Sequence, residues 1–325
     1  MLCVCLISSN IYVTKAQEDV DPVNTGAANF LTISTDARSS AMGATGTAVS
    51  GKDHAIFHNA ATSLLDDDRT GGATYTFTPW MREHESGHSL HSIGGFYKIN
   101  PQNAILAGFR YYNYPKVGIM EEGIPAGKEI RPKEMAIDIA YAREITLNLA
   151  LSATLRYIHS DMGAFAGAKS SNAVAFDLGA FYKGYFPGIN ESGWTVGLTV
   201  ANIGTKLKYL DKKESLPALA KLGGSVDLPV ASAHRLMFAA DLGYRLAPSD
   251  ISALNAGIGA EYTAIDLISV RGGYHYGDKN KADASYATAG VGVKYTGVHL
   301  DFAWLFAESD SPLNNTFQLS LGYSF

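Results

Sequence analysis

The chain ends with the segment NNTFQLSLGYSF, residues 314–325, in which polar and apolar side chains alternate strictly. Every second residue back from the end is apolar: Phe325, Tyr323, Leu321, Leu319 and Phe317. The residues between them are small or polar. A period of two predicts a β-strand, because successive side chains of a strand point to opposite faces. Such a strand could be the edge of a soluble sandwich or part of a membrane β-barrel.

The same alternation recurs along the chain and favours the barrel. From Thr70 onward about fourteen segments repeat it, each near the ~9–11 residues that a tilted membrane strand needs. The expected strands occupy residues 72–80, 89–99, 103–114, 132–145, 147–159, 171–186, 193–204, 219–229, 234–246, 254–265, 266–277, 285–296, 297–308 and 316–325. Charged residues make up only 18% of the chain, against about a quarter in soluble domains. No stretch approaches the ~18 apolar residues of a membrane helix. The fold class is therefore all-β, a transmembrane antiparallel β-barrel.

Charged side chains inside the predicted strands must point away from lipid, because a charge on the lipid face costs about 2–4 kcal/mol at the midplane. In residues 234–246, for example, Leu236, Phe238 and Leu242 share one face and Asp241 lies on the other. The charges expected in the lumen are Asp138, Arg156, Asp177, Asp241, Glu261, Arg271, Lys294 and Asp301. Both signs occur, so we expect ion pairs across a narrow lumen. No catalytic arrangement accompanies them, so no enzyme, metal site or cofactor is predicted.

The connections between strands alternate between tight turns and long loops. In outer-membrane barrels the short turns are periplasmic and the long loops are outside. With an even number of strands, this rule predicts that both termini are periplasmic. Tyr323 and Phe325 would then anchor the last strand at the membrane interface and form the aromatic signal for barrel assembly. One long loop, TKLKYLDKKES at residues 205–215, contains four lysines and could contact anionic lipid or a partner.

The first 69 residues do not alternate. Residues 1–16 resemble a signal peptide that contains both cysteines, Cys3 and Cys5, so the mature chain would have none. Residues 17–69 form an extension and a small periplasmic plug, with short helices expected near 36–43 and 55–65. Residues 70–325 form the outer-membrane barrel.

The plug segment FLTISTDARSSAMGATGTAVSGKDHAIFHNAATSL, residues 30–64, resembles the N-terminal signature of the PorV/PorQ family of Bacteroidota outer-membrane proteins. The motif residues that carry the resemblance are Asp36, Arg38, Met42, Gly43, Gly46, Asp53 and Asn59. The chain differs from the family where Asn59 is followed by Ala60 instead of proline. The resemblance implies a FadL-like barrel of fourteen strands with an N-terminal plug, and a role in type IX secretion.

Two functions of different class follow. The resemblance implies a non-enzymatic accessory subunit of a protein secretion or assembly machine, with outer-membrane lipid and a larger outer-membrane complex as partners. The alternative is a FadL-like channel for small hydrophobic molecules. A channel should contain a continuous apolar pocket between plug and wall, whereas the lumen of a scaffold subunit should be filled. The formal charge of −5 does not indicate a basic surface for binding nucleic acid.

Overall fold

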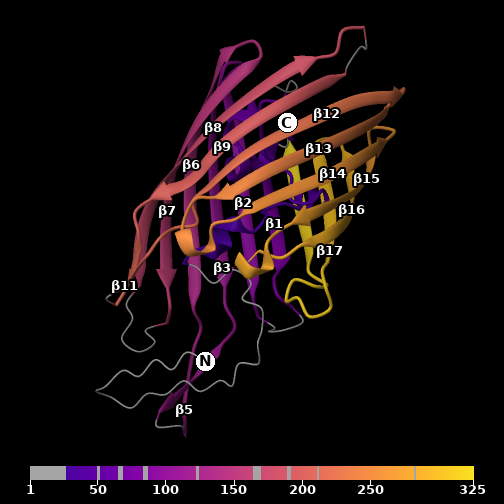
Figure 1. Ribbon diagram of the computed structural model, residues 1–325. Helices are drawn as coiled ribbons and strands as arrows, with labels where there is room; N and C mark the ends of the chain where they lie inside the picture. Colours follow the sequence, from indigo (N-terminus) through magenta and orange to yellow (C-terminus); the bar gives the residue numbers. More distant parts are fainter. Residues whose placement is uncertain are drawn as a thin grey trace.

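A computed structural model describes residues 27–49, 52–64, 69–82, 87–121, 124–163, 170–188, 192–210, 212–281 and 283–325. In this part of the chain fourteen antiparallel strands close into one barrel, in which β1 pairs with β18 (Figure 1). The barrel strands are β1 (Gly71–Pro79), β2 (Ser89–Asn100), β3 (Asn103–Asn113), β6 (Lys133–Thr146), β7 (Leu149–Asp161), β8 (Ser171–Tyr185), β9 (Gly193–Gly204), β12 (Leu219–Ala231), β13 (His234–Arg245), β14 (Leu254–Ala264), β15 (Ile268–Tyr276), β16 (Tyr286–Tyr295), β17 (Val298–Phe306) and β18 (Phe317–Ser324). The predicted fold class and strand number are confirmed.

The strand boundaries differ from the predicted ones by a few residues. The expected strand 147–159 begins only at Leu149, because residues 147 and 148 form the turn that follows β6. Leu147 lies at the tip of this turn and is 90% exposed. Its place in the alternation is therefore incidental.

The two faces of each strand differ as the alternation requires. In β13 the side chains of Phe238, Leu242 and Tyr244 are exposed on the outer wall, whereas Asp241 and Arg245 are buried inside. Exposed apolar residues recur at alternate positions of the other barrel strands. An apolar exterior with charges inside is the arrangement of a barrel that lipid surrounds.

Long loops gather at one end of the barrel, the loop end, and short turns such as residues 101–102 and 296–297 lie at the other, the turn end. Two of the predicted loops contain hairpins that the sequence did not reveal. One is β4 (Val117–Glu121) with β5 (Ile124–Ile130), and the other is β10 (Leu207–Tyr209) with β11 (Lys212–Glu214). Figure 1 shows β5 and β11 at the loop end.

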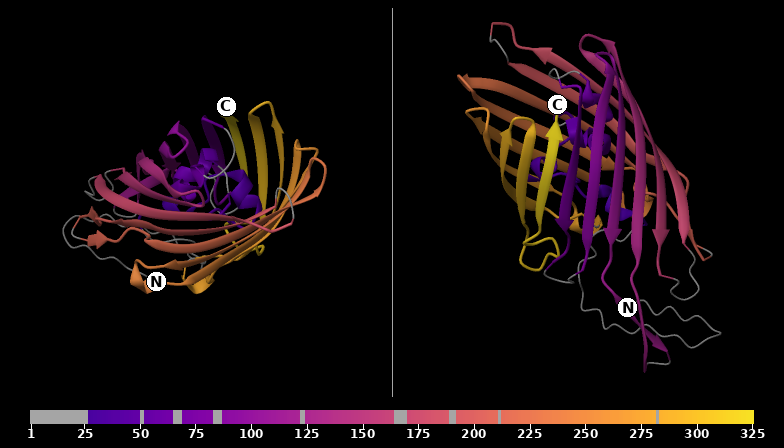
Figure 2. Two further views of the ribbon diagram at one scale, coloured as in Figure 1. Left: turned by 90° about the horizontal axis from the view of Figure 1, so that it is seen from above. Right: turned by 180° about the vertical axis from the view of Figure 1, so that it is seen from behind.

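A plug lies inside the barrel (Figure 2, left). The described part of the plug contains five short helical elements: η1 (Asn29–Thr32), α1 (Ala37–Ala41), η2 (Lys52–His54), α2 (Ala55–His58) and η3 (Ala60–Ser63). Two further turns of 3₁₀ helix, η5 (Ser249–Ile251) and η6 (Lys279–Lys281), lie in the long loops between strands. The helices expected near 36–43 and 55–65 are thus present as short pieces. None of the helices in the described residues is long and apolar enough to cross a membrane.

Glycines of the inner wall allow the plug backbone to approach the strands closely. A methyl group at Gly273 would overlap the backbone nitrogen of Gly43, and one at Gly197 would overlap the carbonyl oxygen of Thr47. Gly43 itself has a φ of 71° and lies against the carbonyls of the wall, so only glycine fits there. The glycine-rich inner faces are therefore the surface on which the plug packs.

The plug runs through the barrel from the loop end to the turn end. Phe30 and Leu31 pack with Trp80, Tyr112 and Leu313 in an apolar cluster at the loop end, which we call the mouth cluster; its other buried members are Ala28, Ile33, Leu90, Ala136, Ile158, Ala173, Ala175, Leu207, Leu216 and Leu305. By contrast, the carbonyl of Phe325 accepts hydrogen bonds from the backbone of residues 70 and 71 at the turn end. The first and last described residues therefore lie at opposite ends of the barrel. The predicted signal peptide, residues 1–16, lies outside the described residues.

Candidate functional site

One ion-pair network joins the plug to the wall. Arg38 of α1 donates two hydrogen bonds to Glu261 of β14, with N–O distances of 2.9 Å and 2.7 Å. Glu261 also pairs with Arg271, its direct partner in the β14–β15 register. Arg271 in turn donates to Asp301 of β17 at 2.6 Å. Two cations and two carboxylates are thus matched in a place where an unpaired charge would be costly.

A second network crosses the opposite part of the wall. Asp138 of β6 pairs with Arg156 of β7, its direct register partner, and with Arg110 of β3 at 3.2 Å. Arg156 also pairs with Asp177 of β8 at 2.7 Å. The Arg110 guanidinium lies 5.2 Å from the ring centroid of Phe57 and donates to the carbonyl of residue 31. This network therefore holds two separate parts of the plug.

Asp241 binds the backbone of the plug instead of another charge. One of its carboxylate oxygens accepts hydrogen bonds from the amides of Gly46 and Thr47 and from the Thr47 hydroxyl, at 2.9, 3.0 and 2.7 Å. The Asn59 amide donates to the carbonyls of Thr47 and Ala180 at 3.0 and 2.9 Å. The plug turn at residues 46–47 is thus fixed from β13 on one side and through Asn59 to β8 on the other.

A buried Asp–His pair stabilises the inside of the plug. Asp36 caps α1 by accepting a hydrogen bond from the Ser39 amide at 2.7 Å, and its other oxygen lies 2.6 Å from Nε2 of His58. Burial raises the pKa of Asp36, but His54, His58 and the hydrogen bonds from His58 and Ser39 together hold it well below its usual value. For His54, burial lowers the pKa. Asp36 is therefore a carboxylate that helps the plug keep its shape.

All seven plug-motif residues named from the sequence lie inside the barrel. Met42 packs with Val49, Met237 and Ala239, and Asp53 lies 3.6 Å from His299 of β17. Of the eight lumen charges, six form the two networks, Asp241 holds the plug turn, and Lys294 lines a cavity at the turn end. Arg110 was missed, although it continues the inward alternation of its strand.

Tyr323 and Phe325 point outward at the turn end, with their rings 6.1 Å apart and more than half of each residue exposed. This is the placement expected of aromatic residues at a membrane interface. Their role as an assembly signal stays a prediction.

Two cavities lie on opposite sides of the plug. The larger, about 500 Å³, opens at the turn end and is lined by charged side chains that include Arg38, Arg235, Glu261, Arg271 and Asp301. The smaller, about 110 Å³, lies toward the loop end between the plug and β9, β12 and β13. The two share no lining residue.

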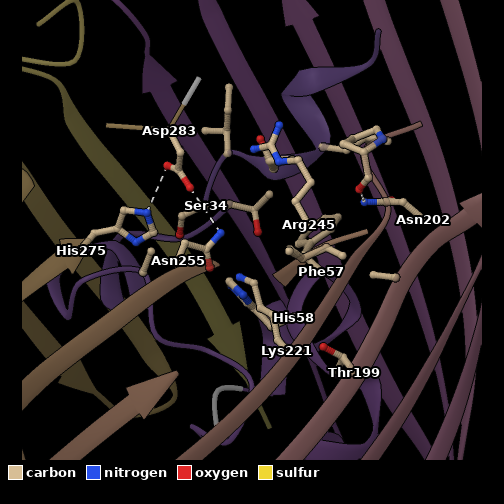
Figure 3. Close-up of a pocket in the computed structure, with 18 of the residues that line it drawn as sticks. Ser34, Phe57, His58, Thr199, Asn202, Lys221, Arg245, Asn255, His275 and Asp283 are labelled. Carbon is tan, nitrogen blue, oxygen red and sulfur yellow. Dashed lines mark hydrogen bonds and ion pairs between the residues drawn. The ribbon is translucent and has the colours of Figure 1, made fainter. Parts of the chain in front are cut away.

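The smaller cavity has a mixed lining (Figure 3): apolar side chains such as Leu31, Phe57 and Trp80 line it together with charged ones. His275 and Asn255 both contact the carboxylate of Asp283, at 3.2 and 3.3 Å, and Lys221 and Arg245 line the same space. A void of only about 10 Å³, lined by Asp36, Arg38, His54 and His58 among others, lies between the two cavities. A void of this size has room for about one water molecule. The plug therefore separates the two cavities.

Together the barrel and its plug define a class: an outer-membrane β-barrel with a plugged, charged lumen. The sequence pattern of the family described as type IX secretion system protein PorV matches residues 15–252. The chain belongs to this family and is a type IX secretion-related outer-membrane barrel, as predicted. No curated protein matches the chain.

The fold is similar to that of solved hydrocarbon transporters. The toluene transporter TodX of Pseudomonas putida has a TM-score of 0.56 at 13% identity over 88% of this chain and 97% of that one. The toluene transporter TbuX of Ralstonia pickettii has a TM-score of 0.52 at 14% identity over 88% and 96%. The channel CymD for monoaromatic hydrocarbons has a TM-score of 0.55 at 12% identity over 88% and 95%. At these identities the likeness concerns the fold alone.

Proposed function

We propose that this protein is a non-enzymatic scaffold subunit of a type IX secretion complex, and that its lumen is not a route for transported molecules. The observation that carries the proposal is the attachment of the plug to the wall. Arg38 and Arg110 hold it through charge networks, and Asp241 holds its backbone.

The alternative, a channel for hydrophobic molecules, needs an apolar path. Apolar side chains such as Trp80 and Leu219 line part of the smaller cavity, but both cavities also present charged side chains, and a hydrophobic solute would have to cross the plug between them. Moving the plug would separate Arg38 from Glu261 inside the barrel. Breaking a buried ion pair typically costs about 3–5 kcal/mol, because one charge is left without a partner. The similarity to the toluene transporters concerns the fold alone, so it does not reduce the free energy needed to break this ion pair.

For orientation, we propose that the loop end faces the outside and that Phe325 lies on the periplasmic side. The first described residues belong to the mouth cluster at the loop end. In this proposed arrangement Phe325 is periplasmic and residue 27 lies on the outer side of the plug. The N-terminus precedes the described residues, so the expectation that it is periplasmic stays a prediction.

We propose that the partners are at least one larger outer-membrane barrel or surface lipoprotein, which meets the long loops or the lipid-facing wall. The wall carries a stacked aromatic group of Phe302, Trp304 and Phe317, with the Arg82 guanidinium 5.1 Å from the Phe317 ring centroid. Since lipid already solvates such a surface, affinity must come from shape and polar contacts. The contact should therefore be large and specific.

The test is purification from the native membrane in mild detergent, followed by identification of the proteins that remain bound. The expected result is a stable complex with another outer-membrane protein. A monodisperse monomer that carries a hydrophobic ligand in stoichiometric amount would contradict the proposal and favour the channel.

A further inference from the structure

The β10–β11 hairpin is fixed to the rim of the barrel. Leu207 is completely buried in the mouth cluster. The Tyr209 hydroxyl donates to Ser160 of β7 and the Lys208 amide donates to Ser171 of β8, both at 2.7 Å. The hairpin therefore lies across the ends of two barrel strands, and Figure 1 shows β11 at the outer edge of the loop end.

This attachment gives the hairpin a cationic outer face. Leu207 and Tyr209 point toward the barrel, so the alternation directs Lys208 the other way. Lys206 is exposed directly before the strand. Lys213 is the direct register partner of Lys208 and shares that face. All three lysines are exposed, and none pairs with a carboxylate among the described residues. Like charges directly opposite each other destabilise an antiparallel pair. The contacts of Leu207, Lys208 and Tyr209 with the barrel hold the hairpin backbone in place, so the lysines cannot separate by moving it. The face is therefore suited to an anion that neutralises it.

The outer wall beside the hairpin is apolar. Thr205, next to the first lysine, donates its amide hydrogen to the carbonyl of Val174 at 2.9 Å. Phe176 and Ile203 lie exposed on the same strands, β8 and β9, and Leu210 is exposed at the hairpin tip. Positive charge thus stands directly at the edge of a surface that acyl chains would cover.

We propose that Lys206, Lys208 and Lys213 bind the phosphate of a lipid headgroup in the outer leaflet. The lysines supply the countercharge, and the wall at Phe176 and Ile203 supports the acyl chains. Lipid is favoured over an acidic protein because it surrounds this wall at all times, so its local concentration exceeds that of any protein. The inference rests on the proposed orientation, in which the loop end meets the outer leaflet.

The test is a titration of the purified full chain in neutral detergent with bisphosphorylated lipid A, read by native mass spectrometry. The variant K208S/K213S removes two lysines of the face. Each lysine near an anionic surface contributes about fivefold to the binding affinity. The affinity of this variant for lipid A should therefore fall roughly 25-fold. The matched control K279S/K281S removes the same charge from another loop at the same end and should bind like the parent chain. Gel mobility before and after boiling shows that each variant is folded.

Two further arms distinguish the source of the phosphate. The parent chain and K208S/K213S should bind phosphatidylcholine with the same affinity. Inorganic phosphate at equal concentration should not displace lipid A from the parent chain. Equal lipid A binding by the parent chain and K208S/K213S would overturn the proposal, as would displacement by inorganic phosphate. Unchanged lipid binding with loss of the co-purifying complex would assign the face to an acidic protein instead.

Discussion

Arg38, on a helix of only five residues, reaches Glu261 on the barrel wall and forms a bidentate ion pair with it. The two residues are 223 positions apart in the chain. The pair is therefore a direct link between the N-terminal segment and the closed barrel, and it is one of the contacts that hold the plug.

Replacing this arginine should destabilise the barrel. In Arg38→Ala, Glu261 keeps only Arg271, and the loss should lie near the lower end of the about 3–5 kcal/mol for a broken buried pair, because the Arg38 side chain is 24% exposed. Urea unfolding of the protein refolded into lipid vesicles measures the change. The exposed pair Lys116–Glu129 is the control, since Lys116→Ala should cost less than about 1 kcal/mol. Equal effects of the two variants would mean that Arg38 does not hold the plug.

Two adjacent glycines test whether the inner wall is shaped for the plug. A methyl group at Gly273 would overlap the backbone of Gly43, whereas one at Gly272 would meet only an oxygen of Thr288 at 3.8 Å. Gly273→Ala should lower stability by about 1–3 kcal/mol through overpacking, and Gly272→Ala should leave it nearly unchanged. The temperature at which the folded band disappears on a gel compares them. A tolerant Gly273 would contradict close packing of the plug at that position.

The stabilisation from Asp36 should depend on pH. Its folded pKa is depressed, so its contribution is present above the unfolded value of about 3.9 and is lost as the pH falls toward the folded pKa. Asp36→Asn keeps a residue that can cap the helix but removes the charge. The variant should be less stable by about 2 kcal/mol near pH 7, and the difference should shrink progressively below about pH 4. A difference that is constant from pH 7 to pH 2 would mean that the charge of Asp36 does not stabilise the plug.

The terminal aromatic ring should matter for insertion. In Phe325→Ala the carbonyl that closes β1 onto the end of the chain remains, so only the ring at the interface is lost. The amount in the outer membrane should fall, as measured by fractionation and immunoblotting. Phe306→Ala removes another half-exposed outer aromatic residue, away from the chain end, and should not reduce the amount in the outer membrane. If both variants reach parent levels, the terminal ring is not an assembly signal.

The strands could be predicted because lipid outside and a packed interior impose opposite chemistry on alternate residues. Asp138 and Glu261 were placed in the lumen on that ground alone. Their partners could not be predicted in the same way. That Asp138 faces Arg156, and also meets Arg110, depends on strand register and on the height of each residue in the barrel. An alternation with a period of two shows which face of the strand a residue lies on, but not how high along the barrel axis it lies.

The hairpins in the loops and the path of the plug were also beyond the sequence. The β10–β11 hairpin has only three residues per strand, too few for alternation to be recognised. The position of Phe30 at the loop end follows from its packing in one cluster with Trp80 and Leu313, residues far away in the chain. The small residues of the plug motif predicted a compact element, but not the direction in which it crosses the lumen.

The most direct test of the closed lumen is uptake of a labelled long-chain fatty acid and of toluene by intact cells that lack their own hydrophobic channel. The full-length chain is compared with an empty vector, a toluene transporter of the same fold serves as positive control, and boiling-dependent gel mobility confirms that the barrel is inserted. The account predicts that the full-length chain gives the uptake of the empty vector. Uptake approaching that of the toluene transporter would contradict it and make the barrel a channel.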